Sequence, residues 1–379
     1  MPKPPLNTIS AIIFVANETV ARQRIAGVTA IGRIVRELAV AGFVRIRIVS
    51  KEMDFGEEAL ADFERLAPGA AVTFSAQMPE GGDTIAFASD YLVPAEEIVR
   101  FAAGNGRELS YQGEPVAWRS AGSGGTMVAA DAVLLDDDAG WELLRRTVKS
   151  GDGLVSRYIN RRISRPISAF MLLFPFIRPV HATAGTALLG IAMLLALLTG
   201  SHAGMIAGAI LFQAASIFDG VDGEIARASF RSSATGASLD SAIDQAINIS
   251  FILGLSYSLT MQGVQFAVYL GLWSVSAMAL GLWLIGRKTV KNGKPLGFDL
   301  VKHKMREGNF GPIAKGVIAF FTFLTARDGF AFLIAVAVSC GQALLALSVF
   351  ATVAMIWIVT VIVAIFPRPE ATEEAPSVL

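Results

Sequence analysis

The first 148 residues alternate short apolar segments with longer segments that carry apolar residues at helical spacing. A segment such as 8–16 (TISAIIFVA) is typical of a buried strand, whereas 30–43 has the periodicity of an amphipathic helix. Strands that alternate with helices predict an α/β domain, with a mostly parallel sheet covered on both faces. The predicted strands are 8–16, 44–50, 71–75 and 83–93, the predicted helices are 30–43, 56–67 and 94–104, and 108–120 is predicted to be a hairpin.

From about Phe170 the apolar segments become long enough to cross a lipid bilayer. Lysine and arginine gather in alternate connections, so the positive-inside rule predicts that both termini are cytoplasmic. The N-terminal segment has no signal-peptide cleavage pattern, and we expect the α/β domain to stay in the cytoplasm. We therefore predict a multi-pass protein of the inner (plasma) membrane, with an all-α six-helix transmembrane domain over 177–367 and a disordered cytoplasmic tail over 368–379. The predicted spans are 181–200, 204–227, 236–259, 265–286, 328–346 and 348–366.

The linker over 149–176 mixes arginine with large apolar side chains. This pattern predicts an amphipathic helix at the membrane surface, where anionic lipids favour basic residues. The basic residues are Arg157, Arg161, Arg162 and Arg165, and the apolar ones are Leu154, Tyr158, Ile159 and Ile163.

The composition supports a membrane protein: 53% of the residues are hydrophobic and the mean hydropathy is +0.55. The formal net charge is zero, so no overall field favours nucleic acid, and we expect no nucleic-acid partner. Cys340 is the only cysteine and lies in an apolar run, where we expect it to pack as a small hydrophobe. The three histidines do not have the spacing of a metal site.

Four aspartates lie where two predicted spans meet the cytoplasm. Asp219 and Asp222 are three residues apart, and Asp240 and Asp244 are four apart, so each pair shares one helix face. The connection between the spans is short, which allows the two faces to meet. Four converging carboxylates would repel one another, and divalent cations relieve that repulsion. Oxygen ligands favour magnesium, manganese or calcium, and two such ions can bridge a phosphate.

The same residues form the pattern D-x-x-D-G-x-x-A-R-x8-G-x3-D-x3-D. This pattern resembles the signature of the CDP-alcohol phosphotransferases and matches it without a change in spacing. Its members here are Asp219, Asp222, Gly223, Ala226, Arg227, Gly236, Asp240 and Asp244.

The resemblance implies that a CDP-alcohol donates its phosphoalcohol to an acceptor hydroxyl and releases CMP. It implies Mg²⁺ or Mn²⁺ in a two-metal site held by Asp219, Asp222, Asp240 and Asp244, with Asp244 as general base. It also implies a homodimer, at least one lipid substrate, and contacts with membrane lipids, as in phospholipid synthesis. The CDP-binding residues that it implies are Asp222, Gly223, Ala226, Arg227 and Gly236.

The first domain resembles a sugar-type nucleotidyltransferase, which in archaeal relatives is an inositol-phosphate cytidylyltransferase fused to a membrane domain that makes a di-inositol phosphate. An active enzyme of that type needs a glycine-rich loop and a lysine after its first strand. Here the segment offers only Arg22, Arg24 and Gly27, and no lysine lies between Asn17 and Ser50. We expect domain 1–148 to be inactive and to serve in regulation, docking or dimerisation, although Asp90 follows a strand where that family has a metal ligand.

Three alternative functions are considered. The chain is bifunctional if the first domain makes the CDP-alcohol from CTP, and it is a cation-coupled transporter if the carboxylates form an ion pathway. The third, a non-enzymatic scaffold, is disfavoured by the intact signature. The role of the loop over 287–316 is a separate question. Its Lys302, Lys304 and Arg306 either bind an acceptor phosphate or only set the topology and contact lipid head groups.

Overall fold

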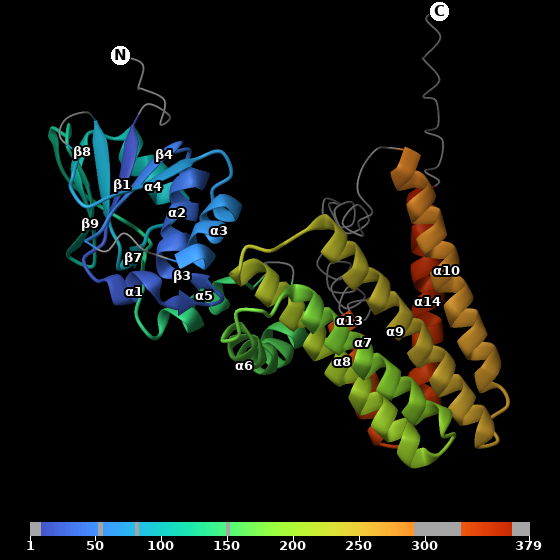
Figure 1. The fold of residues 1–379 in the computed structure, drawn as a ribbon. Coiled ribbons are helices and arrows are strands. Elements are labelled where there is room, and N and C mark those ends of the chain that lie inside the picture. Colours follow the sequence, from blue (N-terminus) through green and yellow to red (C-terminus); the bar gives the residue numbers. More distant parts are fainter. Residues whose placement is uncertain (1–8, 52–55, 80–82, 149–151, 292–326, 366–379) are drawn as a thin grey trace, which may run out of the picture. The chain divides into compact units, whose positions relative to one another are not determined.

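The computed structural model (Figure 1) describes residues 9–51, 56–79, 83–148, 152–291 and 327–365. The chain forms two compact units. The first comprises Met1–Lys149, Arg165–Pro179 and Gly223–Ser232, and the second comprises Ser150–Ser164, Val180–Asp222 and Ser233–Leu379. The first unit therefore contains the predicted α/β domain together with two later segments of the chain.

A seven-stranded sheet forms the centre of the first unit. Its strand order is β10-β8-β9-β6-β1-β4-β5, and the strands next to β1 run parallel to it. Strand β9 runs antiparallel to both β6 and β8, so the sheet is mixed. The strands are β1 (Ser10–Phe14), β4 (Arg45–Val49), β5 (Ala71–Ser75), β6 (Thr84–Ala88), β8 (Gly106–Tyr111), β9 (Glu114–Arg119) and β10 (Gly124–Val128).

The helices that bury this sheet pack on one another, and therefore on the same face. Helix α2 (Ala30–Ala41) contacts both α3 (Gly56–Leu66) and α4 (Ala95–Ala103). Alternate sheet residues such as Ile48 and Phe87 join their core. Ile12 and Val49 on the opposite face are also buried. Helices α2, α3 and α4 account for the cover of one face, and cover of both faces stays a prediction.

Several short elements complete the first unit, and the sequence pattern did not indicate them. Two small ladders pair β2 with β3 and β7 with β11. The short elements are α1 (Glu18–Arg22), β2 (Arg24–Ile25), β3 (Val28–Thr29), β7 (Tyr91–Leu92), β11 (Val133–Leu134) and α5 (Ala139–Arg146).

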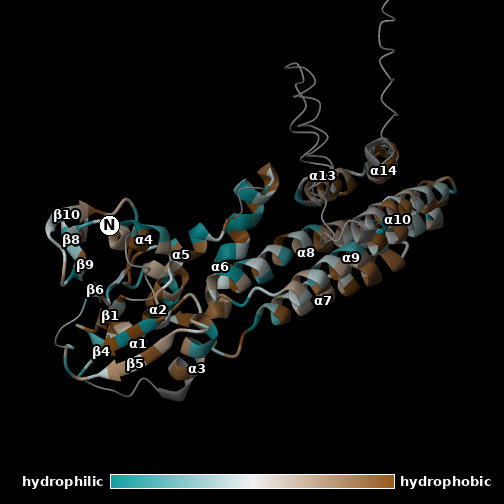
Figure 2. Ribbon diagram, turned by 90° about the horizontal axis from the view of Figure 1, so that it is seen from above, coloured by the Kyte–Doolittle hydropathy of each residue, from teal (hydrophilic) through white to brown (hydrophobic). Residues whose placement is uncertain are grey.

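The second unit is helical along the described chain. A π-helical turn over Ser156–Asn160 leads into α6 (Arg161–Leu172), whose later part belongs to the first unit. Figure 2 shows several hydrophilic residues on α6, in contrast to the largely hydrophobic α7. The long helices are α7 (Pro179–Leu198), α8 (His202–Ala228), α9 (Ala234–Met261), α10 (Ala267–Lys291), α13 (Arg327–Ser339) and α14 (Ala343–Ile365).

Three described helices are long and apolar enough to cross a membrane: Pro179–Leu198, His202–Ala228 and Ala267–Leu284. Two shorter apolar helices lie within α13 and α14. The break between those two was predicted near residue 347, but the structure places it between Ser339 and Ala343. Cys340 lies in that turn and is exposed, so the prediction that it packs as a small hydrophobe was wrong.

Apolar contacts and close approaches at glycine hold the second unit together. The rings of Phe212 on α8 and Phe251 on α9 stack with centroids 4.1 Å apart. At Gly190 on α7, an added Cβ would lie 2.6 Å from Ile247 of α9, so these helices approach closely because glycine has no side chain. This packing positions the ends of α8 and α9, which carry the aspartates.

Candidate active site

Three of the predicted aspartates converge in the second unit. Asp219 near the end of α8, and Asp240 and Asp244 in the first turns of α9, each offer a carboxylate oxygen within 4.8 Å of the others. All three side chains are half-buried. The helical spacing predicted this meeting of two faces, and the short connection over 229–233 makes it possible.

The fourth aspartate, Asp222, lies deeper and is held by a residue that sequence reasoning missed. Asp222 is only 7% exposed and interacts electrostatically with Asp240. Its Oδ2 accepts a hydrogen bond of 2.7 Å from the hydroxyl of Thr183, a buried residue of α7. A threonine in an apolar helix gives no sequence signal of this kind, because its partner is 39 residues away.

Arg161 supports the same end of α8. Its Nε donates to Asp152 at 2.9 Å, and its Nη1 donates to the carbonyl oxygen of Gly220 at 3.1 Å. Arg161 is buried, so the prediction that it belongs to a lipid-facing basic surface was wrong, whereas Arg157 and Arg162 are exposed. Arg161 differs from Arg157 and Arg162 because it forms an ion pair with Asp152 that is largely shielded from water. A buried arginine needs such a charged partner or a carbonyl acceptor.

The donor set fits a hard divalent cation. Three carboxylate oxygens within 4.8 Å, from side chains that water still reaches, match the all-oxygen ligands of Mg²⁺ or Mn²⁺. Without a cation, carboxylates this close would repel one another strongly. The cluster therefore supports the predicted metal ligands Asp219, Asp240 and Asp244, with Asp222 beside Asp240.

Of the predicted CDP-binding residues on α8, Gly223, Ala226 and Arg227 belong to the first unit, and Asp222 belongs to the second. An added Cβ on Gly223 would lie 2.9 Å from Nη1 of Arg227, so the guanidinium lies directly over this glycine. Nε of Arg227 also donates to the Thr147 carbonyl at 2.8 Å. Ala226 lies on the same turns of α8.

Of the other four predicted substrate-binding residues, the structure describes only Gly236. Gly236 lies in the first turn of α9, where its amide donates to the hydroxyl of the helix cap Ser233 at 3.0 Å. Lys302, Lys304 and Arg306, predicted for acceptor binding, lie outside the described residues.

In the α/β domain, the strand order reverses between β1 and β6, the point where open α/β sheets bind ligands at their carboxyl ends. The segment after β1 forms the short helix α1. Asn17 caps it and accepts hydrogen bonds from the amides of Thr19 and Val20 at 3.0 and 3.3 Å. These amides are therefore occupied by a side chain of the protein. Asp90 follows β6 at the same edge of the sheet.

The residues weighed as substitutes for a glycine-rich loop have structural partners. Gly27 has a φ of +84°, and an added Cβ would lie 2.6 Å from Leu172 of α6. The side chain of Arg24 donates to the Gly27 carbonyl at 2.8 Å. Gly27 therefore serves a tight turn and a close contact within the first unit.

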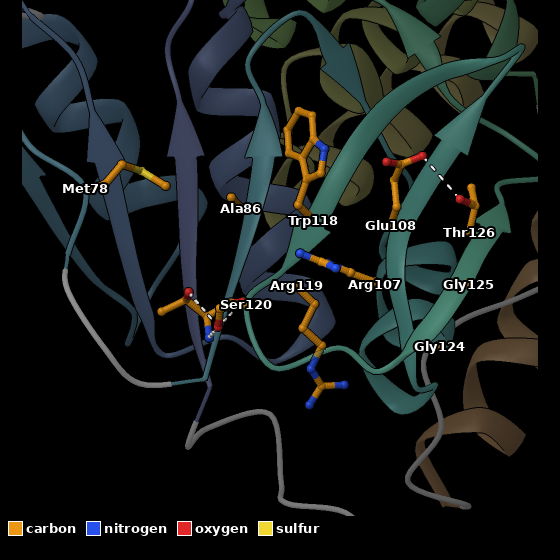
Figure 3. A pocket seen from close by; sticks show the side chains of 11 residues that line it. Met78, Ala86, Arg107, Glu108, Trp118, Arg119, Ser120, Gly124, Gly125 and Thr126 are labelled. Carbon is orange, nitrogen blue, oxygen red and sulfur yellow. Dashed lines mark hydrogen bonds between the residues drawn. The ribbon is translucent and has the colours of Figure 1, made fainter.

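A pocket of about 470 Å³ lies elsewhere in this domain (Figure 3). It is open on the sheet, and Glu108 and Thr126 on neighbouring strands hydrogen-bond across it at 3.4 Å. Neither Asp90 nor the segment after β1 lines it. The lining residues are Met78, Thr84, Ala86, Arg107, Glu108, Trp118, Arg119, Ser120, Gly124, Gly125 and Thr126.

Comparison with known protein families supports the interpretation of the aspartate cluster. The family model for CDP-alcohol phosphatidyltransferase matches residues 176–354. Residues 176–354 are therefore similar to a CDP-alcohol phosphatidyltransferase domain, and the family resemblance predicted from the signature is confirmed. This family consists of transferases of phosphate-containing groups, and the apolar helices agree with a membrane protein.

Several relatives carry the name bifunctional IPC transferase and DIPP synthase, which agrees with the predicted resemblance to a two-domain fusion. The chain is similar to the one from Thermococcus kodakarensis, with 42% identity over 129 residues, 34% of this chain and 28% of the relative. It is also similar to those from Archaeoglobus fulgidus, with 38% identity over 122 residues (32% and 24%), and from Rubrobacter xylanophilus, with 36% identity over 210 residues (51% and 45%). The matched segments span less than half the length of these relatives.

Proposed function

We propose that the protein transfers the phosphoalcohol group of a CDP-alcohol to an acceptor hydroxyl and releases CMP. The observation that carries this proposal is the convergence of Asp219, Asp240 and Asp244 from two helices. The family match of residues 176–354 supports the reaction class. Transfer of this kind requires neutralisation of phosphate charge and alignment of the attacking oxygen more than covalent help from the protein.

In this proposal Asp219, Asp222 and Asp240 mainly hold Mg²⁺ or Mn²⁺, while Asp244, which lies in the same cluster, acts chiefly as the general base. When bound, the cations neutralise charge on the donor pyrophosphate. The Asp244 carboxylate accepts the proton of the acceptor hydroxyl. The hydroxyl oxygen forms a bond to the phosphorus that carries the alcohol, and the bond from that phosphorus to the bridging oxygen breaks. The bridging oxygen leaves with CMP, so the products are a phosphodiester, CMP and one proton.

Gly223, Ala226 and Arg227 form the CDP side of the site. Gly223 has no side chain, which lets the Arg227 guanidinium lie directly over the backbone of α8. That guanidinium supplies a planar group that matches phosphate oxygens. Gly236, in the first turn of α9, completes the proposed CDP-binding residues.

The six apolar helices cross the plasma membrane in this proposal, with both termini cytoplasmic. The apolar length of α7, α8 and α10 supports it, as does the placement of basic residues in the predicted cytoplasmic connections. The site then lies at the cytoplasmic membrane surface, which suits a substrate with its tails in the bilayer. We propose a homodimer as the assembled form, on the family resemblance.

The α/β domain does not make CDP-alcohol in this proposal. The absence of a glycine-rich loop and the use of the Thr19 and Val20 amides by Asn17 both support that view. A bifunctional chain is the second candidate, because the named relatives are bifunctional.

The test is an assay of the purified full-length protein in nanodiscs. CDP-alcohols, lipid and inositol-based, are offered with hydroxyl acceptors, and CMP and the product phosphodiester are measured by mass spectrometry. We expect CMP release that requires Mg²⁺ or Mn²⁺ and stops with EDTA. Metal-independent release, or none with any donor, contradicts the proposal. Pyrophosphate release from CTP and an alcohol phosphate would establish the bifunctional candidate instead.

A further inference from the structure

The α/β domain contacts the C-terminal end of α8, and both belong to the first unit. The last carbonyls of a helix have no partner within it. Here the Ala228 carbonyl accepts a hydrogen bond of 2.7 Å from Nη2 of Arg33. The next two carbonyls, of Ser229 and Phe230, accept from Nη1 of Arg65 at 3.0 and 3.1 Å.

Arg33 joins this helix end to the hairpin of β2 and β3. Its Nε and Nη2 donate to the Ile25 carbonyl at 2.9 and 2.7 Å, and Nη2 also donates to Ala26 at 2.9 Å. The side chain is only 2% exposed. Burial lowers the pKa of Arg33 to about 9, so the guanidinium is still charged at neutral pH. A positive charge at the negative end of a helix is favourable.

The chain leaves α8 through a Schellman turn with an unusual residue. The Arg231 amide bonds to the Ala226 carbonyl at 2.8 Å, and the Phe230 amide bonds to the Arg227 carbonyl at 3.3 Å. Phe230 therefore occupies the left-handed position, with a φ of +54°, where glycine is usual. The guanidiniums of Arg36 and Arg33 lie 4.6 and 5.3 Å from the centre of its ring. Cation–π contacts of this kind compensate for the unfavourable backbone.

The same domain also holds the side chain of Arg227. Thr147 ends α5, and its carbonyl accepts the 2.8 Å hydrogen bond from Nε of Arg227. That bond places the guanidinium over Gly223. The α/β domain thus fixes both the backbone after Arg227 and the direction of its side chain.

We propose that the α/β domain is a positioning module for the CDP-binding end of α8, with Arg33 and Arg65 as the positioning residues. This proposal rests on the proposed function, and gives the domain a role that needs no nucleotide of its own. Ordering residues 223–232 before the donor arrives lowers the cost of donor binding. Loss of the contacts therefore weakens donor binding and leaves the hydroxyl acceptor largely unaffected.

The experiment uses the full-length protein in nanodiscs and the variant Arg65→Met. Arg65 is partly exposed and lies outside the hairpin contacts of Arg33, so its replacement leaves the fold of the domain intact. Arg100→Met is the matched control. Arg100 also pairs with an acid three residues earlier and donates to a backbone carbonyl, that of Val128, but it does not contact α8. Arg65→Lys tests for rescue by a shorter donor.

Two quantities are measured: hydrogen exchange of the peptide 223–232, and the KM and kcat for a CDP-alcohol. For Arg65→Met we expect faster exchange in that peptide and a KM for the donor raised about tenfold, as expected from losing hydrogen bonds to a charged donor. Arg65→Lys should recover part of both effects, and Arg100→Met should match the wild type. Equal exchange and equal KM in Arg65→Met and Arg100→Met would overturn the proposal. Failure of the wild type to release CMP would refute the proposed reaction, while the exchange data would still decide whether the contacts order α8.

Discussion

Asp222 is buried against the hydroxyl of Thr183, and that contact decides how its carboxylate is presented. The hydrogen bond of 2.7 Å fixes the position of one carboxylate oxygen, Oδ2. Thr186 lies one turn further along α7, is equally buried, and donates to the carbonyl of its own helix at Ala182. Thr183 therefore contacts the site, whereas the Thr186 hydroxyl bonds within its own helix, so comparing variants of the two distinguishes an effect on the site from an effect on helix packing.

We predict that Thr183→Val lowers CMP release about tenfold, because a buried hydrogen bond to a charged group is worth about 1.5–3 kcal/mol. Thr186→Val involves the same change of side-chain volume. It should keep wild-type activity, and the Mg²⁺ concentration that it needs for half-maximal activity should not rise. The measurement is CMP release over a Mg²⁺ titration of both variants. Equal effects of the two substitutions would show that Thr183 does not orient Asp222.

Asp244 lies one helical turn beyond Asp240, and we predict that Asp244→Asn keeps donor and metal binding but loses the transfer rate. A general base contributes roughly 10²–10⁴-fold to a rate, so kcat should fall within that range. Calorimetric titration of CDP-alcohol and Mn²⁺ into the variant, alongside CMP release, measures the two properties separately. Loss of Mn²⁺ or donor binding together with activity would make Asp244 a ligand and leave the base unassigned.

At the scale of elements, the helices of the second unit pack through small residues. Ile247 Cγ1 lies 2.6 Å from the position of an added Cβ on Gly190. Isoleucine is stiff about its first side-chain torsion, so it does not move aside without cost. The contact joins α7 with α9, which carries Asp240 and Asp244.

We predict that Gly190→Ala destabilises the protein by about 1–3 kcal/mol, the usual cost of overpacking a tight core. Adding Ile247→Ala should restore part of the lost stability, because the smaller side chain makes room for the new methyl group. Thermal unfolding of the single and double variants in the same detergent gives the coupling. Additive losses in the double variant would contradict the close packing of α7 and α9.

The elements also show which parts of the fold the sequence pattern could predict. The bounds of α7 to α10 agree with the predicted spans within a few residues, because long apolar segments end at polar connections. The turn between α13 and α14 was misplaced because the apolar segment continues through it. Its local signal was Gly341, whose φ of +78° only glycine adopts readily.

At the scale of the whole molecule, the single cysteine reports on topology. Cys340 is exposed in the turn between α13 and α14. If the helices cross the membrane as proposed, with both termini cytoplasmic, this turn lies on the opposite side. A membrane-impermeant maleimide should therefore label Cys340 in intact cells, and Cys340→Ser should abolish the labelling. Labelling that requires permeabilised cells would contradict the proposed orientation.

The convergence of the aspartates could be predicted from their spacing alone. In two helices joined by a short connection, residues three or four positions apart share a face, and the two faces can meet. The contacts of α8 with the α/β domain could not be predicted in this way. Arg33 and Arg65 lie in segments with ordinary helical periodicity, and their partners are backbone carbonyls 195 and 164 residues away. Every residue has a backbone carbonyl, so the amino-acid type at the acceptor position does not indicate such a contact. Only the folded structure identifies these contacts.

The central claim is that the aspartate cluster transfers a phosphoalcohol group, and Asp240 tests it most directly, because its carboxylate faces the other three. The measurement is CMP release from a CDP-alcohol by Asp240→Asn at saturating Mg²⁺, with the exposed Asp137→Asn as control. We predict that the turnover of Asp240→Asn is at least about 10²-fold below that of the wild type, because removing one electrostatic donor or ligand at a reacting centre costs that much in rate. Asp137→Asn should keep wild-type turnover. Near-normal turnover in folded, membrane-inserted Asp240→Asn would contradict the account.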